Sequence, residues 1–275
     1  MNLRTRINGQ PETTIVSDDR GLCYGDGLFE TVWLHESRAP LWTRHMARLG
    51  EGCRRLQMPV PDPEMLWREV QAVSTGLNRA VVRITWTRGR GPRGYAPPRD
   101  QQPTCVVSSA ELPLPAAGWY HQGIRMHLCR TRLAMQPALA GLKHLNRLEQ
   151  VLARNEWHDE TVGEGLMLDL EDRAIGATAA NVFAVRDGQL FTPALARCGV
   201  AGTARAEILA ECAAATVADM ALSDLEQADE VFLTSAVRGI VPVRELAGRT
   251  WPVGPFTRRL QARWQAAGLP PQVSA

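Results

Sequence analysis

The sequence contains a single lysine, Lys143, within the segment GLKHLNRLEQ at residues 141–150. The chain has 31 lysine and arginine residues in total, and all the others are arginine. Arginine stays protonated in proteins, whereas a lysine amine can lose its proton and condense with a carbonyl to form a Schiff base. A GC-rich codon bias would also leave few lysines. The count alone therefore keeps both interpretations open.

The predicted surroundings of Lys143 favour a reactive amine. The preceding segment QPALAG is typical of a loop. The residues after the lysine place an apolar stripe at helical spacing, formed by Leu145, Leu148, Val151 and Leu152. We therefore expect Lys143 to lie where this loop gives way to a helix, in the first helical turn. The positive end of the helix dipole disfavours an ammonium group there.

Three other segments contain groups that bind anions. Arg48 lies on a predicted helix after His45 and can hold a phosphate with two hydrogen bonds. The segment GVAGTAR at 199–205 is a glycine-rich turn that opens a helix, so the amides of Thr203 and Ala204 can bind an anion. Ser235 ends a predicted strand. Each group also has an ordinary structural explanation, as a solvated helix arginine or a helix cap.

Composition and charge exclude several classes of protein. The chain has 275 residues, 45% of them hydrophobic, and a formal net charge of +2, so no broad basic field for nucleic acid or anionic membrane is predicted. No apolar run has the length of a membrane span, and MNLRTRINGQ does not resemble a signal peptide. The six cysteines are scattered, and neither they nor the histidines show metal-ligand spacing. We expect a cytoplasmic protein with reduced thiols and no metal site.

Strand and helix patterns alternate along the chain without a repeat. Strands are predicted at 12–17, 30–42 (a hairpin turning near Ser37–Pro40), 79–87, 104–110, 123–132, 164–172, 181–193 (a hairpin turning at Asp187–Gly188) and 229–243. Helices are predicted at 43–57, 63–75, 146–158, 203–217 and 256–267.

These elements predict an α+β chain of two domains. The strands are mostly antiparallel with flanking helices, and regular strand–helix alternation is missing. The segment ELPLPAAGW is the best linker candidate, so we expect an N-terminal domain at 1–113 and a C-terminal domain at 114–275 that carries Lys143. No glycine-rich dinucleotide motif or Walker loop occurs at a strand–helix junction.

The order of several motifs resembles a known enzyme family. The motifs are SDDRGLCYGDGLFETV, RHMARL, TRGRGPRGY, LAGLKHLNRLEQVLARNE, ATAANVF, FTPALARCGVAGTAR and DEVFLTSAVRGIVPV. They resemble, over nearly the whole chain, the class-IV or fold-type IV pyridoxal-phosphate enzymes. This family includes branched-chain and D-amino-acid aminotransferases and 4-amino-4-deoxychorismate lyase. GLKHLNRLEQVLARNE and TRGRGPRGY are most similar to the lyase members.

The resemblance implies a cofactor and a role for each candidate residue. Lys143 is expected to form the Schiff base with pyridoxal 5′-phosphate. The expected phosphate ligands are Arg48, the amides of Thr203 and Ala204, and Ser235. Asn181, in AANVF, is expected to flank the pyridine ring. The family fold has two α+β domains, as in D-amino-acid aminotransferase, and its members are usually homodimers.

The chain departs from the family at Gly176. The family has an acidic residue, usually Glu, five positions before the asparagine of ATAANVF, and it pairs with the pyridine nitrogen. Here that position is glycine. Asp172 and Glu171 lie nearby, but a hairpin turn is expected to direct them to solvent. Thr178 or a water molecule remains as a neutral alternative.

The implied activity is the elimination of pyruvate from 4-amino-4-deoxychorismate to give p-aminobenzoate, a step of folate synthesis. Lys143 is the expected general base. For the dianionic substrate we expect Arg88, Arg90 and Arg93 as cationic partners and Tyr95 as a hydrogen-bond donor, although this loop can equally be solvated. Because aromatisation drives this elimination, Gly176 favours a lyase over a transaminase.

Three alternatives stay open at this point. The first is an amino-acid aminotransferase on the same fold. The second is an RNA-binding role for RGRGPRG, which the absence of a basic surplus disfavours. The third is an enzyme that binds the cofactor without turnover, for which Gly176 is the only support.

Overall fold

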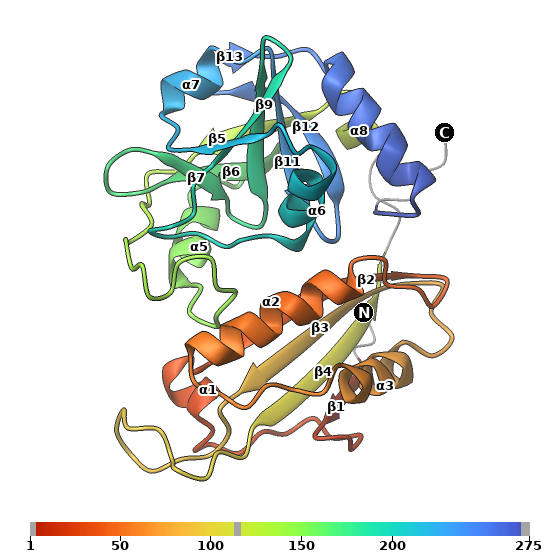
Figure 1. The fold of residues 1–275 in the computed structure, drawn as a ribbon, viewed down its shortest axis with the longest axis vertical. Helices are drawn as coiled ribbons and strands as arrows, with labels where there is room; N and C mark the ends of the chain where they lie inside the picture. The colour runs from red at the N-terminus through yellow and green to blue at the C-terminus, as the bar shows by residue number, and fades with distance from the viewer. Residues whose placement is uncertain (1–3, 113–116, 271–275) are drawn as a thin grey trace. The chain divides into compact units, whose positions relative to one another are not determined.

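The computed structural model describes residues 4–112 and 117–270, and its elements are labelled in Figure 1. The chain divides into two compact units. Unit 1 is Met1–Pro113 with Leu142–Asn146, and unit 2 is Leu114–Gly141 with Arg147–Ala275. The predicted boundary between 113 and 114 lies outside the described residues. The segment that contains Lys143 groups with unit 1, although the sequence placed it in the C-terminal domain.

Unit 1 contains a four-stranded antiparallel sheet in the order β1-β4-β3-β2. The strands are β1 (Arg4–Ile7), β2 (Gly27–His35), β3 (Arg79–Thr87) and β4 (Thr104–Glu111). Strand β2 lies at the edge of this sheet, and Leu28 forms an isolated antiparallel bridge with His144. The segment Leu142–Asn146 therefore covers backbone groups that an edge strand leaves unpaired.

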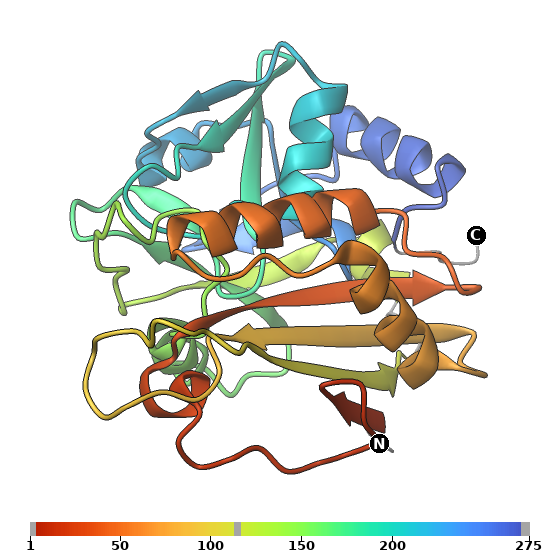
Figure 2. The same cartoon turned by 60° about the horizontal axis from the view of Figure 1, so that its bottom comes forward.

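Three helices accompany this sheet: α1 (Arg20–Tyr24), α2 (Trp42–Arg55) and α3 (Pro63–Ser74). Helix α2 contacts β2, and α3 contacts β1, β3 and β4 (Figure 2). Helix α3 begins as its sequence predicts, because the Asp62 side chain accepts bonds from the amides of Glu64 and Met65 and Pro63 occupies the first turn. Helix α2 buries His45, Leu49 and Cys53 on one face.

Unit 2 contains a nine-stranded sheet in the order β10-β9-β8-β11-β12-β5-β6-β7, with β13 paired to β12. The strands are β5 (Ile124–Leu128), β6 (Val162–Leu168), β7 (Ala174–Ala177), β8 (Asn181–Arg186), β9 (Gln189–Pro193), β10 (Thr216–Ala218), β11 (Glu230–Ser235), β12 (Gly239–Leu246) and β13 (Arg249–Thr250). The Ala177 amide donates to the Ala180 carbonyl at 2.7 Å, which joins the end of β7 to the start of β8. Strand β7, at one end of this order, also contacts β8 and β9 near the other end, so the sheet curls on itself.

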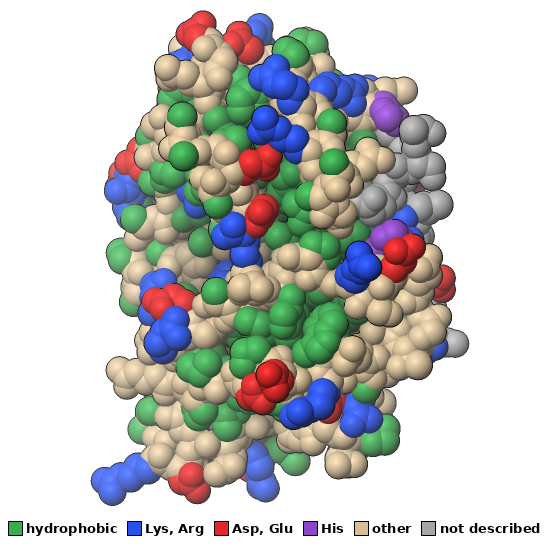
Figure 3. All heavy atoms as spheres, turned by 45° about the vertical axis from the view of Figure 1, so that its right-hand side comes forward, with side chains coloured by type: hydrophobic (Ala, Val, Ile, Leu, Met, Phe, Trp, Pro, Cys, Tyr) green, Lys and Arg blue, Asp and Glu red, His purple; other side chains and the backbone are tan. Residues whose placement is uncertain are grey.

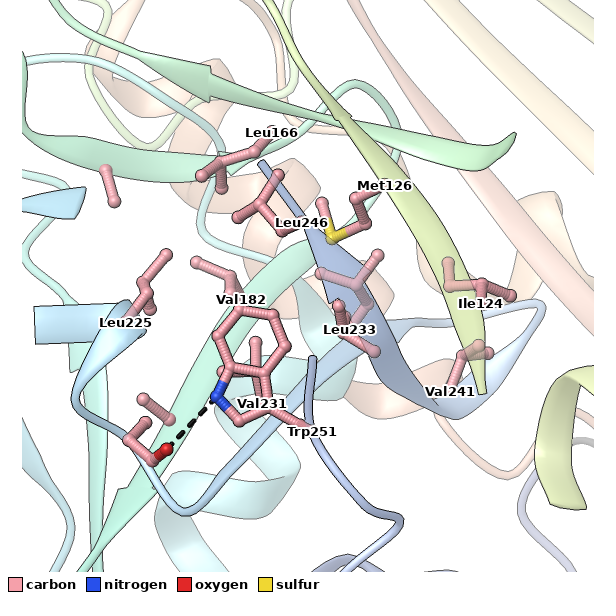
Figure 4. Packing of buried hydrophobic residues seen from close by; sticks show 14 of the residues in the cluster. Ile124, Met126, Leu166, Val182, Leu225, Val231, Leu233, Val241, Leu246 and Trp251 are labelled. Atoms are coloured by element: carbon pink, nitrogen blue, oxygen red, sulfur yellow. Dashed lines mark hydrogen bonds between the residues drawn. The ribbon is translucent and has the colours of Figure 1, made fainter. Parts of the chain in front are cut away.

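The interior of unit 2 is filled from one face of this curled sheet (Figure 4). Val182 on β8 and Val231 and Leu233 on β11 point into this core, and the Trp251 indole closes it by donating Nε1 to the Ala228 carbonyl at 3.0 Å. Successive side chains of a strand point to opposite faces. Phe183 and Phe232 therefore lie on the other face, where their rings stack at 5.2 Å.

The helices of unit 2 are α4 (Ala117–His121), α5 (Leu148–Arg154), α6 (Thr203–Glu211), α7 (Leu222–Glu226) and α8 (Pro255–Ala266). Helices α6 and α8 both contact β11. The hairpin predicted at Asp187–Gly188 is confirmed, with φ of 51° and 73° at these two residues.

Three expected elements differ in the structure. Residues 12–17 form no strand. The hairpin predicted at 30–42 is confirmed at its turn, where His35 bridges Arg38 and Glu36 and Ser37 have φ of 49° and 59°. No second strand follows, because α2 begins at Trp42. The helix predicted at 203–217 ends at Glu211, and residues 216–218 form β10.

No helix among residues 4–112 and 117–270 is long and apolar enough to cross a membrane. On the face shown in Figure 3, basic and acidic side chains of the described chain are interspersed. This distribution agrees with the small net charge of the sequence.

Candidate active site

Lys143 lies in an extended segment against the edge of the unit 1 sheet. The Phe29 amide donates to the Lys143 carbonyl at 2.9 Å, and the Leu145 amide donates to the Gly27 carbonyl at 3.0 Å. The Lys143 amine lies 4.2 Å from the centre of the Phe29 ring. These contacts fix the lysine backbone on β2 and place its amine over an aromatic face.

The prediction that Lys143 occupies the first turn of a helix is wrong. Helix α5 begins at Leu148, after the N-cap residue Arg147, so the helix dipole does not act at the lysine. The apolar stripe correctly indicated a helix, but three of its residues are not buried: Leu148, Val151 and Leu152 are 76%, 60% and 61% exposed. The helical spacing of apolar residues alone could not show whether this face of α5 is buried or exposed.

A buried ionic cluster of Glu30, His45 and Arg48 lies in unit 1 near the lysine. His45 Nδ1 donates to Glu30 Oε2 at 2.6 Å, and Arg48 donates Nε to Glu30 Oε1 at 2.9 Å and Nη2 to Oε2. Glu30 and His45 are each 1% exposed. The cluster joins β2 to α2 and holds the Arg48 guanidinium in a fixed direction.

The cluster shifts the pKa values of its members. Burial raises the pKa of Glu30, but the charge of Arg48 and the bonds from His45 and Arg48 outweigh it and lower that pKa to about 2. Burial lowers the pKa of His45. Glu30 opposes this shift, while the positive charges of Arg48 and Lys143 add to it. Glu30 is therefore an anion at neutral pH, and Lys143 lies within electrostatic reach of His45.

The second group of predicted residues lies in unit 2, around the N-terminus of α6. Asn181 Oδ1 accepts a bond from the Gly202 amide at 3.0 Å, and its Nδ2 donates to the Val200 carbonyl at 2.8 Å. Asn181 is also the register partner of Thr234 across β8 and β11. The structure thus brings the start of β8, the end of β11 and the first turn of α6 together.

This region has buried polar groups that lack a partner. The hydroxyls of Thr203 and Thr234 are buried, and within the described part of the chain neither has a hydrogen-bond partner. Such orphaned groups are costly unless a ligand or water satisfies them. Together with the amides at the N-terminus of α6, they fit a phosphate group. We call Thr203, Ala204 and Thr234 the anion site.

Sequence reasoning missed Thr234 and selected its neighbour Ser235. The Ser235 Oγ accepts the Arg238 amide at 3.1 Å, so this hydroxyl fixes the turn that follows β11. The only sequence signal for Thr234 was its place beside Ser235 at the end of a strand. The strand register decides which of the two hydroxyls faces Asn181.

The structure clarifies the surroundings of Gly176. A side-chain carbon at this position would come 3.0 Å from the Ala180 carbonyl oxygen, so the turn before β8 leaves little room for a carboxylate. Asp172 and Glu171 have side chains 75% and 57% exposed, as expected for a turn. The Thr178 hydroxyl instead donates to the buried carboxylate of Glu164.

The loop with the predicted substrate-binding residues lies in unit 1. Arg88 is buried, and its guanidinium donates to Asp26 at 2.8 Å, to Gln101 at 2.9 Å and to the carbonyls of Leu56 and Gln57 at 2.9 and 3.0 Å. This network makes Arg88 a structural arginine and leaves its guanidinium little capacity for a substrate.

The other loop residues are more accessible. Arg90 pairs with Asp18 at 2.8 Å, and both side chains are largely exposed. Arg93 is exposed, and Tyr95 is 87% exposed with its ring 5.5 Å from that of Tyr24. The loop is anchored by Arg20, which the sequence did not indicate.

Arg20 is 3% exposed and bonds the loop backbone directly. Its Nη1 donates to the Gly94 carbonyl at 3.0 Å and its Nη2 to the Tyr95 carbonyl at 3.0 Å. Its Nε donates to Asp26 at 2.8 Å. Asp26 thus joins Arg20 to Arg88.

Among the described residues no cluster of three or more potential metal ligands occurs.

Comparisons with known proteins identify the family and the fold of this chain. The family model Amino-transferase class IV matches residues 27–246. An aminodeoxychorismate lyase of Vibrio harveyi is 37% identical over 93% of this chain and 97% of its own length. A crystal structure of 4-amino-4-deoxychorismate lyase from Pseudomonas aeruginosa matches with a TM-score of 0.91 and 46% identity, over 95% of this chain and 98% of that one.

A branched-chain amino acid aminotransferase of T.th., solved with pyridoxamine 5′-phosphate, has the same fold. Its TM-score is 0.83 at 23% identity, over 98% of this chain and 95% of that one. These matches confirm the predicted fold-type IV architecture. The chain belongs to the class IV aminotransferase family.

Proposed function

We propose that this protein is a pyridoxal-phosphate-dependent lyase that converts 4-amino-4-deoxychorismate to p-aminobenzoate and pyruvate. The observation that carries the proposal is the nearly full-length similarity to two lyases, at 37% and 46% identity. The similarity to the branched-chain aminotransferase, at 23%, supports the fold alone. Lys143, the sole lysine of the chain, supplies the amine that such a reaction needs.

The residues of the anion site support cofactor binding. We assign the cofactor phosphate to the amides of Thr203 and Ala204 and to the orphaned hydroxyls of Thr203 and Thr234. Asn181 holds the first turn of α6 in place through Gly202. Ser235 and Arg48 remain predicted phosphate ligands, and Glu30 orients the Arg48 guanidinium.

Bound at Lys143, pyridoxal phosphate supplies an electrophilic carbonyl and an electron sink. In the proposed reaction, the Lys143 amine takes the proton from the ring carbon that bears the substrate amine. The neighbouring carbon–oxygen bond then breaks, the ring becomes aromatic, and enolpyruvate leaves. Protonated Lys143 returns the proton to this leaving group, which becomes pyruvate. The Lys143 amine lies over the face of the Phe29 ring, which holds it in place.

Gly176 is consistent with elimination. Without a carboxylate at this position, the ring nitrogen of the cofactor is less strongly held in its protonated form, and this weakens the electron sink on which transamination depends. Aromatisation supplies driving force that transamination does not have. Thr178 is the neutral hydroxyl closest in sequence, and its proton is directed to Glu164.

We also propose a homodimer in the cytoplasm. Leu148, Val151 and Leu152 form an exposed apolar face on α5, and burying such a face against a second copy removes it from water. All six cysteines are free thiols, which supports a reducing compartment. The dimer is testable by analytical ultracentrifugation.

The deciding experiment follows p-aminobenzoate and pyruvate together after the protein, loaded with pyridoxal phosphate, receives 4-amino-4-deoxychorismate. Equimolar products are expected from the natural protein and none from Lys143→Ala. Borohydride reduction followed by peptide mass spectrometry should place the cofactor on Lys143. A loaded protein that forms no product would refute the lyase.

The aminotransferase alternative has its own readout on the same sample. Addition of an amino acid would convert the cofactor absorbance to that of the pyridoxamine form. We expect little conversion by L-leucine or D-alanine. Rapid and complete conversion would favour an aminotransferase.

A further inference from the structure

Unit 2 contains a buried carboxylate that the proposed reaction does not use. The Glu164 side chain on β6 is 3% exposed and accepts bonds from the Thr178 hydroxyl and from the Gly165 amide at 3.1 Å. A buried carboxylate needs an opposite charge as well as hydrogen bonds. Within the described part of the chain its single ion pair is with Arg238, whose Nη1 lies 3.1 Å from Glu164 Oε2.

Arg238 is held from several sides and yet remains accessible. Its amide donates to Ser235 Oγ at 3.1 Å, its carbonyl accepts the Tyr120 hydroxyl at 3.0 Å, and its guanidinium lies 5.4 Å from the centre of the Trp119 ring. Its side chain is nevertheless 44% exposed. Of the three guanidinium nitrogens of Arg238, only Nη1 forms a hydrogen bond to a described residue. Nε and Nη2 can therefore donate to a ligand from a fixed position.

The position of Arg238 relates it to the anion site. It lies in the turn between β11 and β12, three residues after Ser235. Thr234 at the end of β11 faces Asn181 at the start of β8, which bonds to the first turn of α6. The anion site and the guanidinium thus belong to the same end of these strands. The amides and hydroxyls of the anion site suit a phosphate, whereas the planar guanidinium of Arg238 suits a carboxylate.

We propose that Arg238 binds a carboxylate of the substrate and that Glu164 is the positioning residue that orients its guanidinium. The proposal rests on the lyase function for the identity of the substrate, which carries two carboxylates. A guanidinium fork matches a carboxylate with two parallel bonds, and a fork that is already oriented loses less entropy on binding. Arg238 takes the role that the sequence gave to Arg88, whose guanidinium is occupied by Asp26 and Gln101.

The first test compares steady-state kinetics of Arg238→Met with the natural protein. Loss of a charge-assisted pair should raise KM roughly tenfold to hundredfold. The kcat should stay within about threefold, because the bond is made equally before and during the reaction. Arg238→Lys keeps the charge without the fork, so its KM should be intermediate. Arg249→Met, at an exposed arginine on β13, is the matched control and should change neither constant.

Glu164→Gln tests the positioning role. It should raise KM less than Arg238→Met does, with kcat and the cofactor absorbance unchanged. A merely structural pair would instead lower the melting temperature and the cofactor content of both variants and leave KM of the loaded protein unchanged. That result would overturn the proposal.

A binding measurement separates this proposal from the lyase function. Calorimetry of the loaded protein with benzoate, which has the ring carboxylate but no amine, and with pyruvate requires no turnover. At least one of the two ligands should bind roughly tenfold more weakly to Arg238→Met. If the natural protein forms no p-aminobenzoate but this loss is observed, the lyase proposal fails and the role of Arg238 stands. Equal affinities of both proteins for both ligands would refute the role of Arg238.

Discussion

Replacement of Glu30 by Gln should reveal how strongly the buried ionic cluster stabilises the protein. The folded pKa of Glu30 is about 2, compared with a reference value of 4.5. One pKa unit corresponds to about 1.4 kcal/mol, so the charged form of Glu30 contributes about 3 kcal/mol to folding at pH 7. Because the folded pKa is depressed, this contribution is fully present above the unfolded pKa. It declines as the pH falls from 4.5 towards 2.

Urea denaturation at pH 7 and pH 3.5 provides the assay. Glu30→Gln should reduce the free energy of unfolding by about 3 kcal/mol at pH 7 and by about 2 kcal/mol at pH 3.5. The control is Glu51→Gln on α2, the helix that carries His45 and Arg48; its partner Arg54 lies 2.9 Å away, and both side chains are more than half exposed. An exposed pair of this kind contributes about 0–1 kcal/mol. A Glu30→Gln effect no larger than that of the control, or one that does not decline at low pH, would refute the electrostatic account.

Three further predictions concern other parts of the chain. Thr203→Val removes an orphaned hydroxyl from the anion site and should weaken pyridoxal-phosphate binding roughly tenfold by fluorescence titration, whereas unchanged affinity would remove that hydroxyl from the site. Leu148→Glu places a charge on the exposed face of α5 and should shift the sedimentation coefficient from dimer to monomer, whereas a dimer that persists would place the interface elsewhere. Cys23 is exposed, while burial raises the pKa of the Cys53 and Cys105 thiols to about 12, so a thiol reagent should give a fast phase that Cys23→Ser abolishes.

Local sequence signals predicted those elements whose ends are defined by local chemistry. The helix α3 begins at Pro63 after a capping aspartate, and β3 occupies the whole of the predicted range 79–87. The turn at Asp187–Gly188 follows from residues that accept positive φ. In these cases the residues that determine the structure lie within a few positions of one another.

Predictions failed where distant residues decide the outcome. The backbone around Lys143 is extended because Gly27 and Phe29 provide hydrogen bonds from the edge of another element, and no local pattern encodes that partner. The sequence predicts Arg88 as a substrate ligand, but its guanidinium donates to Asp26 and Gln101, which no local pattern indicates. The roles of Arg238 and Glu164 depend equally on strand pairing, since these two residues are separated by more than seventy positions.

The grouping of Leu142–Asn146 with unit 1 makes that unit discontinuous in the chain. Residues 1–113 by themselves lack the segment that pairs with Gly27 and Phe29, so a fragment that ends there would expose an incomplete sheet edge. During synthesis on the ribosome, unit 1 cannot complete its hydrogen bonding until residue 146 has emerged. Its last native contacts are therefore of long sequence separation and form late. The Lys143 amine, on which the proposed chemistry depends, therefore reaches its native position only after residues 142–146 have paired with β2.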